Sequence, residues 1–101
     1  MAGQNLAPTS SVVFTTTGGT GNHDTVTFAS DGDYVEIINL GATRISVIVD
    51  PGATDPTVDG DGTITVPAGG TLLEPSRARG STAVKAISSA ACDVAMRVVH
   101  G

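Results

Sequence analysis

The sequence offers few residues whose types and spacing could do chemistry. Asn22-His23-Asp24 sets a titratable imidazole beside a carboxylate, the arrangement that orients the base of a catalytic triad. However, no serine or cysteine lies in a recognisable nucleophile elbow, and neighbours in sequence do not have triad geometry. The run Gly18-Gly19-Thr20-Gly21 lacks the lysine and the following helix of a phosphate-binding loop. We therefore predict a solvated loop histidine and no enzymatic activity.

Three aspartates in one loop are a second candidate for chemistry. Asp55, Asp59 and Asp61 lie in the longest irregular segment, residues 51–62, and could suggest calcium. An EF-hand loop needs oxygen ligands at alternate positions and a closing glutamate at position twelve, and this spacing is absent. Asp-Gly turns between strands explain the aspartates more simply. We predict no cofactor and no metal, and whether the Asp55–Asp61 loop binds an ion stays open at this point.

Cys92 is the only cysteine, so the chain has no internal disulfide. It stands at the head of an apolar run with no His or Lys beside it, which predicts a buried small side chain and not a reactive thiol. The N-terminus lacks the basic flank and apolar stretch of a signal peptide, and no run approaches the roughly 20 apolar residues of a membrane span. We expect a chain folded in a cytoplasm, with no membrane partner.

Composition argues against two further classes of function. Five Lys and Arg side chains against ten Asp and Glu give a net charge of −5, which would repel a phosphate backbone, so no nucleic-acid partner is expected. The aromatic share is 3%, from Phe14, Phe28 and Tyr34, with no tryptophan. Aromatic side chains normally line deep small-molecule pockets, and they also supply the stacking platforms of carbohydrate sites. Only Tyr34 is available for stacking, which disfavours a sugar-binding site.

The elements that carry these residues are predicted to be short strands. Eight apolar-rich runs alternate with Gly, Pro, Asn and Asp, at residues 12–16, 25–29, 34–39, 43–50, 63–66, 71–73, 82–87 and 93–99. Such runs predict an all-β fold, a small antiparallel β-sandwich or barrel of about eight short strands. Residues 82–94 also match a helix stripe from Ala83 to Val94, but Ser88-Ser89 interrupts it, and strand is favoured.

The chain is short enough to form one domain. Its 101 residues leave little room for a second core, so residues 11–101 are expected to form a single β-sandwich domain. Residues 1–10 are small and polar, which predicts a flexible N-terminal arm outside the core that orders only against a partner.

Two hairpins are expected within the domain. Residues 34–39 and 43–50 flank the turn-like Leu40-Gly41-Ala42, and residues 63–66 and 71–73 flank a type I turn that starts at Val66. Alternation assigns one face of the best runs to the core: Val35, Ile37, Ile45, Val47, Val49, Val84, Val94, Met96 and Val98. Ile38 and Ile48 then point outward, which predicts an outer face covered by the N-terminal arm or by another subunit.

Three segments carry a resemblance to a known class of proteins. They are "GDYVEIINLGATRISVIVD", "PTVDGDGTITVPAGG" and "TAVKAISSAACDVAMRVV". In this order the chain from Thr25 to Val99 resembles the small β-rich structural proteins that tailed bacteriophages of actinobacterial hosts encode among their virion genes. The resemblance implies a capsid decoration (cement) protein on the outside of the major capsid shell, or a neck or tail-completion subunit. A small carbohydrate-binding or adhesin-like β-sandwich is the alternative from a different class.

A virion module of this kind would be made in the host cytoplasm and located in the virion. It would work as one of many copies, held by contacts with the major capsid protein or other virion proteins and with copies of itself, as a homo-oligomer. The predicted contact residues are Leu6, Pro8, Ile38, Ile48, Asp59, Asp61, Arg77 and Arg79. The two arginines share one loop and the two aspartates another, so they could pair between adjacent subunits and set their register.

Overall fold

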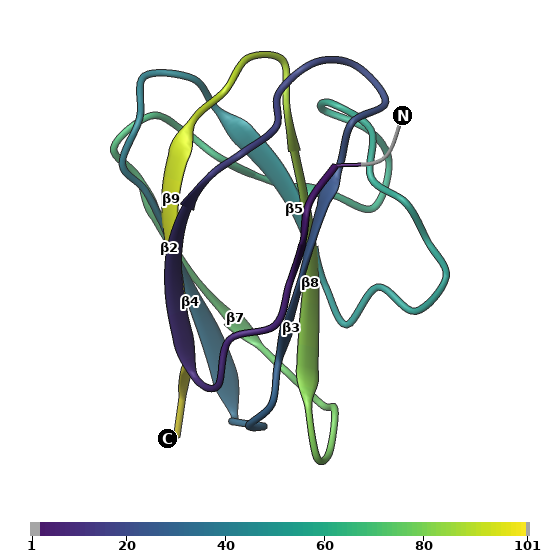
Figure 1. Cartoon of the computed structure of the whole chain (residues 1–101), viewed down its shortest axis with the longest axis vertical. Helices are drawn as coiled ribbons and strands as arrows, with labels where there is room; N and C mark the ends of the chain where they lie inside the picture. The colour runs from purple at the N-terminus through teal and green to yellow at the C-terminus, as the bar shows by residue number, and fades with distance from the viewer. Residues whose placement is uncertain (1–2, 101) are drawn as a thin grey trace.

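A computed structural model describes residues 3–100, which form nine β-strands and no helix. The strands make two sheets that face each other across the core (Figure 1). One is a five-stranded sheet in the order β1-β3-β8-β5-β6, and the other a four-stranded sheet in the order β2-β9-β4-β7. The strands are β1 Asn5–Leu6, β2 Ser11–Thr15, β3 Asp24–Phe28, β4 Tyr34–Asn39, β5 Ile45–Val49, β6 Ile64–Val66, β7 Thr71–Pro75, β8 Thr82–Ser88 and β9 Asp93–Val99. The predicted all-β sandwich is confirmed.

The strands pair in a nested pattern. β2 pairs with β9, β3 with β8, β4 with β7 and β5 with β6, all antiparallel, and β4–β9 and β5–β8 join these pairs into the sheets. A chain paired this way is one long antiparallel ribbon wrapped around itself, which is the double Greek key of a jelly roll. Among the described strands only β1 is added outside this scheme, parallel to β3.

Both predicted hairpins are wrong in their pairing, although their strands are in the right places. β4 lies in the four-stranded sheet and β5 in the five-stranded sheet, so the chain crosses the core between them. β6 and β7 are likewise in opposite sheets. The turn between them is real, but it spans Pro67 to Gly70, with a 2.8 Å bond from Gly70 N to Pro67 O. Gly69 has φ +73° at its third position, which is a type II turn and not the type I turn predicted from Val66.

The predicted N-terminal arm contributes a strand instead of lying outside the core. Thr25 N donates to Gln4 O at 2.9 Å, and Ala29 N to Pro8 O at 2.9 Å, so residues 4–8 run along β3. Leu6 packs against the core cluster. Backbone bonds to an existing strand hold this polar segment without a partner molecule, which hydropathy alone does not reveal. Of the predicted arm, residues 1 and 2 lie outside the described residues.

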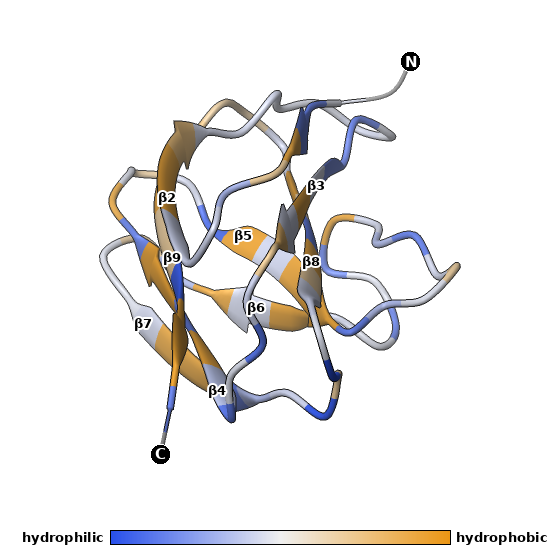
Figure 2. Ribbon diagram, turned by 60° about the horizontal axis from the view of Figure 1, so that its bottom comes forward, coloured by the Kyte–Doolittle hydropathy of each residue, from blue (hydrophilic) through white to orange (hydrophobic). Residues whose placement is uncertain are grey.

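The core lies between the sheets and uses the predicted face of each strand. Alternating hydropathy along the strands is visible in Figure 2. Seven of the nine predicted core residues are buried, and Val49 and Val98 are partly buried against them. The remaining core side chains are not among the nine predicted ones: Phe14, Val26, Phe28, Val66, Ala86 and Cys92. Residues 82–88 are strand and not helix, as predicted.

The outer face of the five-stranded sheet is covered by the chain itself. Residues 50–63, which we call the covering loop, leave β5 and fold back before entering β6 (Figure 1, teal-green, right). Asp59 N donates to Ser46 Oγ at 2.9 Å, and Lys85 Nζ bonds Asp55 Oδ1 at 2.7 Å. The Ser46 side chain points outward from β5, and the covering loop leaves it only 1% exposed. Ile48, on the same outward row as Lys85, is half-buried, so its cover comes from its own chain. Within residues 3–100 there is no helix long and apolar enough to cross a membrane.

Candidate binding face

The outer face of the four-stranded sheet has no covering segment among the described residues. We call it the open face, and it is made of the outward side chains Ser11, Val13, Thr15, Tyr34, Glu36, Ile38, Thr71, Leu73, Asp93, Ala95, Arg97 and Val99. Val13 and Leu73 are 70% and 52% exposed, although both are large apolar side chains in regular strands. The open face is therefore the outer face on which large apolar side chains remain exposed in regular strands.

A shallow groove of about 510 Å³ crosses the open face over β2, β9 and β4. Register places Val13, Ala95 and Ile38 side by side across these strands, so they form an apolar row along the groove. The next row contains Ser11, Arg97 and Glu36. The apolar row and the charged row thus run side by side across the strands, two residues apart along each strand.

The charged row is organised by one cross-strand ion pair. Arg97 Nε donates to Glu36 Oε1 at 2.5 Å, and their side chains are 61% and 23% exposed. On the other side of the apolar row, outside the groove, Thr15 Oγ1 donates to Asp93 Oδ1 at 2.5 Å. Opposite charges facing each other across a sheet stabilise it by roughly 0.2–1 kcal/mol, and exposed pairs stay near the lower end. The pair therefore positions charge on the face more than it stabilises the fold.

The predicted contact residues are spread over the molecule. Only Ile38 lies in the groove. Leu6 packs on the core and the Pro8 carbonyl accepts from Ala29 N, just after β3, while Ile48 lies on the opposite outer face. Arg77, Arg79 and Asp61 are exposed in loops, and the Arg77 amide donates to Asp50 Oδ2 at 2.9 Å. The structure does not bring these residues together into one surface within a single chain.

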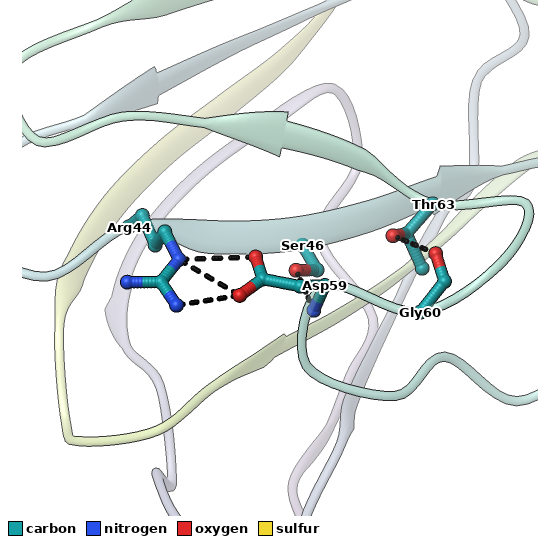
Figure 3. Close-up of polar contacts among 5 residues, drawn as sticks. All are labelled: Arg44, Ser46, Asp59, Gly60 and Thr63. Atoms are coloured by element: carbon teal, nitrogen blue, oxygen red, sulfur yellow. Dashed lines mark hydrogen bonds and ion pairs between the residues drawn. The ribbon is translucent and has the colours of Figure 1, made fainter.

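Asp59 already has a partner in its own chain. Arg44 Nε lies 3.0 Å from each oxygen of the Asp59 carboxylate, and Arg44 Nη2 also bonds Asp59 Oδ2 (Figure 3). This bidentate bond comes first among the causes that raise the pKa of Arg44 and lower the pKa of Asp59. Thr63 Oγ1 donates to Gly60 O at 2.6 Å and closes the turn after it. Pairing of Asp59 with an arginine of another subunit would have to compete with Arg44.

Acid should loosen the covering loop before it unfolds the sandwich. The pKa of Asp55 is lowered chiefly by its bond from Lys85, and that of Asp59 by its bond from Arg44. A lowered carboxyl pKa gives stability that is present above the usual value of about 4 and is lost as the pH falls through the lowered value. We expect the protection factor of the Asp59 amide, which is its intrinsic exchange rate at a given pH divided by its observed rate, to fall below about pH 4 while core amides such as Val94 stay protected. A protection factor at Asp59 that is the same at pH 6 and pH 2.5, or an Asp55→Asn/Asp59→Asn double variant that keeps the acid step, would contradict this assignment.

The residues first considered for chemistry have structural roles. Asp24 is fully buried and accepts bonds from Gln4 N and from Thr17 N and Oγ1. His23 lies 3.5 Å from Asp55, at the edge of the covering loop. Cys92 is buried as predicted, with its thiol bonded to Asn39 Oδ1 at 3.0 Å. No group of three or more His, Cys, Asp or Glu side chains that could hold a metal ion is found in residues 3–100.

The open face itself was not predicted, and a signal for it is present in the sequence. The last run alternates Val94, Met96 and Val98 with Ala95, Arg97 and Val99, and the second set is neither core nor fully polar. Antiparallel pairing of this run with residues 34–39 would have set Arg97 opposite Glu36. The pairing was missed because residues 34–39 were assigned to the wrong partner.

No protein-family model and no curated protein matches the sequence. Solved structures do match. A carbohydrate-binding module from a sugar cane soil metagenome, CBM_E1, solved with cellopentaose and gadolinium ion, is 17% identical, with a TM-score of 0.62 over 94% of this chain and 89% of that one. PliG from Aeromonas hydrophila, a periplasmic inhibitor of g-type lysozyme, is 12% identical, with a TM-score of 0.57 over 96% and 98%. The likeness is one of fold.

Proposed function

We propose that the protein is a non-catalytic binding module that docks through its open face onto the surface of another protein. The observation that carries the proposal is the uneven treatment of the two outer faces. The covering loop closes one, while the other keeps Val13 and Leu73 exposed beside a groove. Regular strands that keep large apolar side chains in water are typical of surfaces that are covered in an assembly.

The chemistry of the face favours a protein over a sugar. The groove is floored by aliphatic groups, Val13, Ala95 and Ile38, which can bury area against another apolar surface. Its charged row holds an exposed arginine, a residue type enriched at the centres of interfaces. An arginine with one bond to Glu36 keeps further N–H donors for a partner's carbonyl or carboxylate groups.

The form we propose for the partner is the shell of a tailed-phage virion, with the protein as a decoration subunit. Support comes from the sequence resemblance described above and from the jelly-roll architecture, which is common in viral shell proteins and in lectins. A small acidic sandwich without disulfides gains stability from neighbours when they bind its folded state. A position at the neck or tail of the particle uses the same face and is the nearest alternative.

Binding to shells tests the proposal directly. Purified protein should co-sediment with shells assembled from the major capsid protein encoded in the same genome, and should saturate them at a fixed copy number. Leu73→Asp puts a charge into the open face and should weaken binding at least tenfold, which corresponds to about 1.4 kcal/mol. The protein should remain folded, because Leu73 is exposed. Thr27→Asp is the matched control, because Thr27 is exposed on outward β3 of the other sheet. Equal binding by both variants, or none by the parent protein, would overturn the proposal.

An extended glycan on the same face is the second candidate function. It is favoured by the fold likeness to a module solved with cellopentaose and by Tyr34, an aromatic side chain on the open face beside Val99 and Pro75. Titration calorimetry with cellopentaose separates the two candidates. Saturable binding that Tyr34→Ala removes would establish the glycan, whereas no heat with cellopentaose alongside shell binding supports the docking module.

A further inference from the structure

The four edge strands of the sandwich differ in how they are protected. In the five-stranded sheet β1 has two residues and β6 three, too short to attract a long partner. In the four-stranded sheet β7 carries Glu74 and ends on Pro75. The opposite edge is β2, Ser11-Val12-Val13-Phe14-Thr15, with no charge, proline or glycine. Edge strands without such features are the ones that pair with another chain.

The backbone of β2 presents a defined set of groups at this edge. Val98 N donates to Ser10 O at 3.0 Å and Thr16 N to Cys92 O at 2.8 Å, so the even-numbered residues bond toward β9. Alternation then directs the N–H and C=O groups of Ser11, Val13 and Thr15 away from β9. Thr15 O accepts the side-chain amide of Gln4 at 2.6 Å, which uses one of its two lone pairs.

This edge is complementary to itself. Its three outward-bonding residues are symmetric about Val13, so a second copy running antiparallel sets Val13 opposite Val13 and Ser11 opposite Thr15. Each of these is a hydrogen-bonded pair in which both residues use N–H and C=O groups that β9 leaves unused. A two-fold axis through Val13 generates this arrangement without further adjustment, as expected of an isologous dimer interface.

The side chains of the open face continue across the same axis. Val13, Ala95 and Ile38 form a row in one copy, and the row of the second copy would extend it through the Val13 contact. The end of β2 beside Arg97 would face the end beside Asp93 of the second copy, so no like charges are brought together across the axis.

We propose that two copies of this chain pair along β2, with Val13 opposite Val13, into one continuous eight-stranded sheet. The pairing leaves both grooves on the same outer surface, and it does not depend on the proposed docking function. An edge contact buries less area than a standard interface, which predicts a weak dimer that neighbours on a larger surface would reinforce.

Analytical ultracentrifugation over a concentration series tests the dimer. Val13→Lys should raise the dissociation constant at least tenfold, because a charge at the centre of the contact is the usual protection of an edge strand. Leu73→Lys is the matched control, since it places the same charge on the same face at the opposite edge, and it should leave the dimer unchanged. Circular dichroism melting checks that both variants remain folded.

Cysteine crosslinking tests the register. Paired Val13 positions would have Cα atoms about 5.5 Å apart, within the range of a disulfide, whereas the two Ser11 positions would lie about 14 Å apart. Under mild oxidation Val13→Cys should crosslink and Ser11→Cys should not, and the buried Cys92 does not compete. A parent protein that stays monomeric at the highest soluble concentration, or equal crosslinking by both variants, would overturn the pairing. It would leave shell binding by the open face to be judged separately.

Discussion

Asn39→Ala should lower the free energy of unfolding by about 3–5 kcal/mol, because it leaves buried polar groups without partners and opens a cavity. Asn39 is 1% exposed, and all four of its side-chain bonds are used. Its Nδ2 donates to Thr43 O at 2.8 Å and to Val66 O at 3.0 Å. Its Oδ1 accepts from Gly41 N and from Cys92 Sγ, each at 3.0 Å.

These bonds join the end of β4 to the other sheet and to the crossing that follows β4. Asn39 ends β4 in one sheet, and Val66 ends β6 in the other. Thr43 lies between β4 and β5, where the chain crosses from the first sheet to the second. A domain of about 100 residues is stable by about 5–15 kcal/mol, so the expected loss is a large part of the total. The measurement is urea unfolding followed by circular dichroism.

Asn39→Asp separates hydrogen bonding from packing in this cluster. The aspartate has almost the same volume, but it turns two donors into an acceptor that faces the carbonyls of Thr43 and Val66. It should therefore destabilise at least as much as alanine at neutral pH. Asn22→Ala is the control for a loop amide, since Asn22 makes one 3.2 Å bond to Gly18 O and should cost under about 1 kcal/mol. An alanine variant at position 39 that loses no more than Asn22→Ala would show that the cluster is not a structural link.

The same residue explains why strands could be predicted and their partners could not. Alternation is local, so residues 34–39 and 93–99 were found with their observed bounds. Partner choice depends on where the chain goes after Asn39. Leu40-Gly41-Ala42 has the composition of a hairpin turn, but the buried bonds of Asn39 direct the chain across to the other sheet. A pattern of side-chain hydropathy does not contain that information.

The candidate site could not be predicted for the same reason, because the surroundings of an outward residue depend on which sheet its strand joins. Ile38 and Ile48 were both predicted to point outward and to need a cover, and the sequence treats them alike. Ile48 lies on the outer face that carries the covering loop, whereas Ile38 lies in the groove of the open face. The two differ because β4 and β5 belong to different sheets. Arg97 and Glu36 become neighbours only once β9 is known to pair with β4.

Asp24 was considered for catalysis beside His23, and its position in the fold assigns it to structure. The short strand β1 and the segment after β2 both approach the start of β3, and the Asp24 carboxylate lies between them. It accepts Gln4 N at 2.8 Å on one side and Thr17 N at 2.8 Å and Thr17 Oγ1 at 2.5 Å on the other. Burying a carboxylate is unfavourable unless hydrogen bonds replace its water, and three donors do so here.

Asp24→Ala should cost about 2–4 kcal/mol, since a buried, fully bonded side chain is removed and two partly buried backbone amides lose their acceptor. The loss should be local at first, so the Gln4 and Thr25 amides should exchange much faster, while Val94 in the other sheet stays protected until global unfolding. Asp24→Asn keeps one acceptor oxygen and should lose about half as much. Asp61→Ala, in the exposed loop, should stay within about 0.5 kcal/mol of the parent protein. The Asp24 bonds add to the backbone bonds that hold residues 4–8 along β3. An Asp24→Ala protein with unchanged stability and unchanged exchange at Gln4 would therefore show that the carboxylate contributes nothing to the attachment of β1.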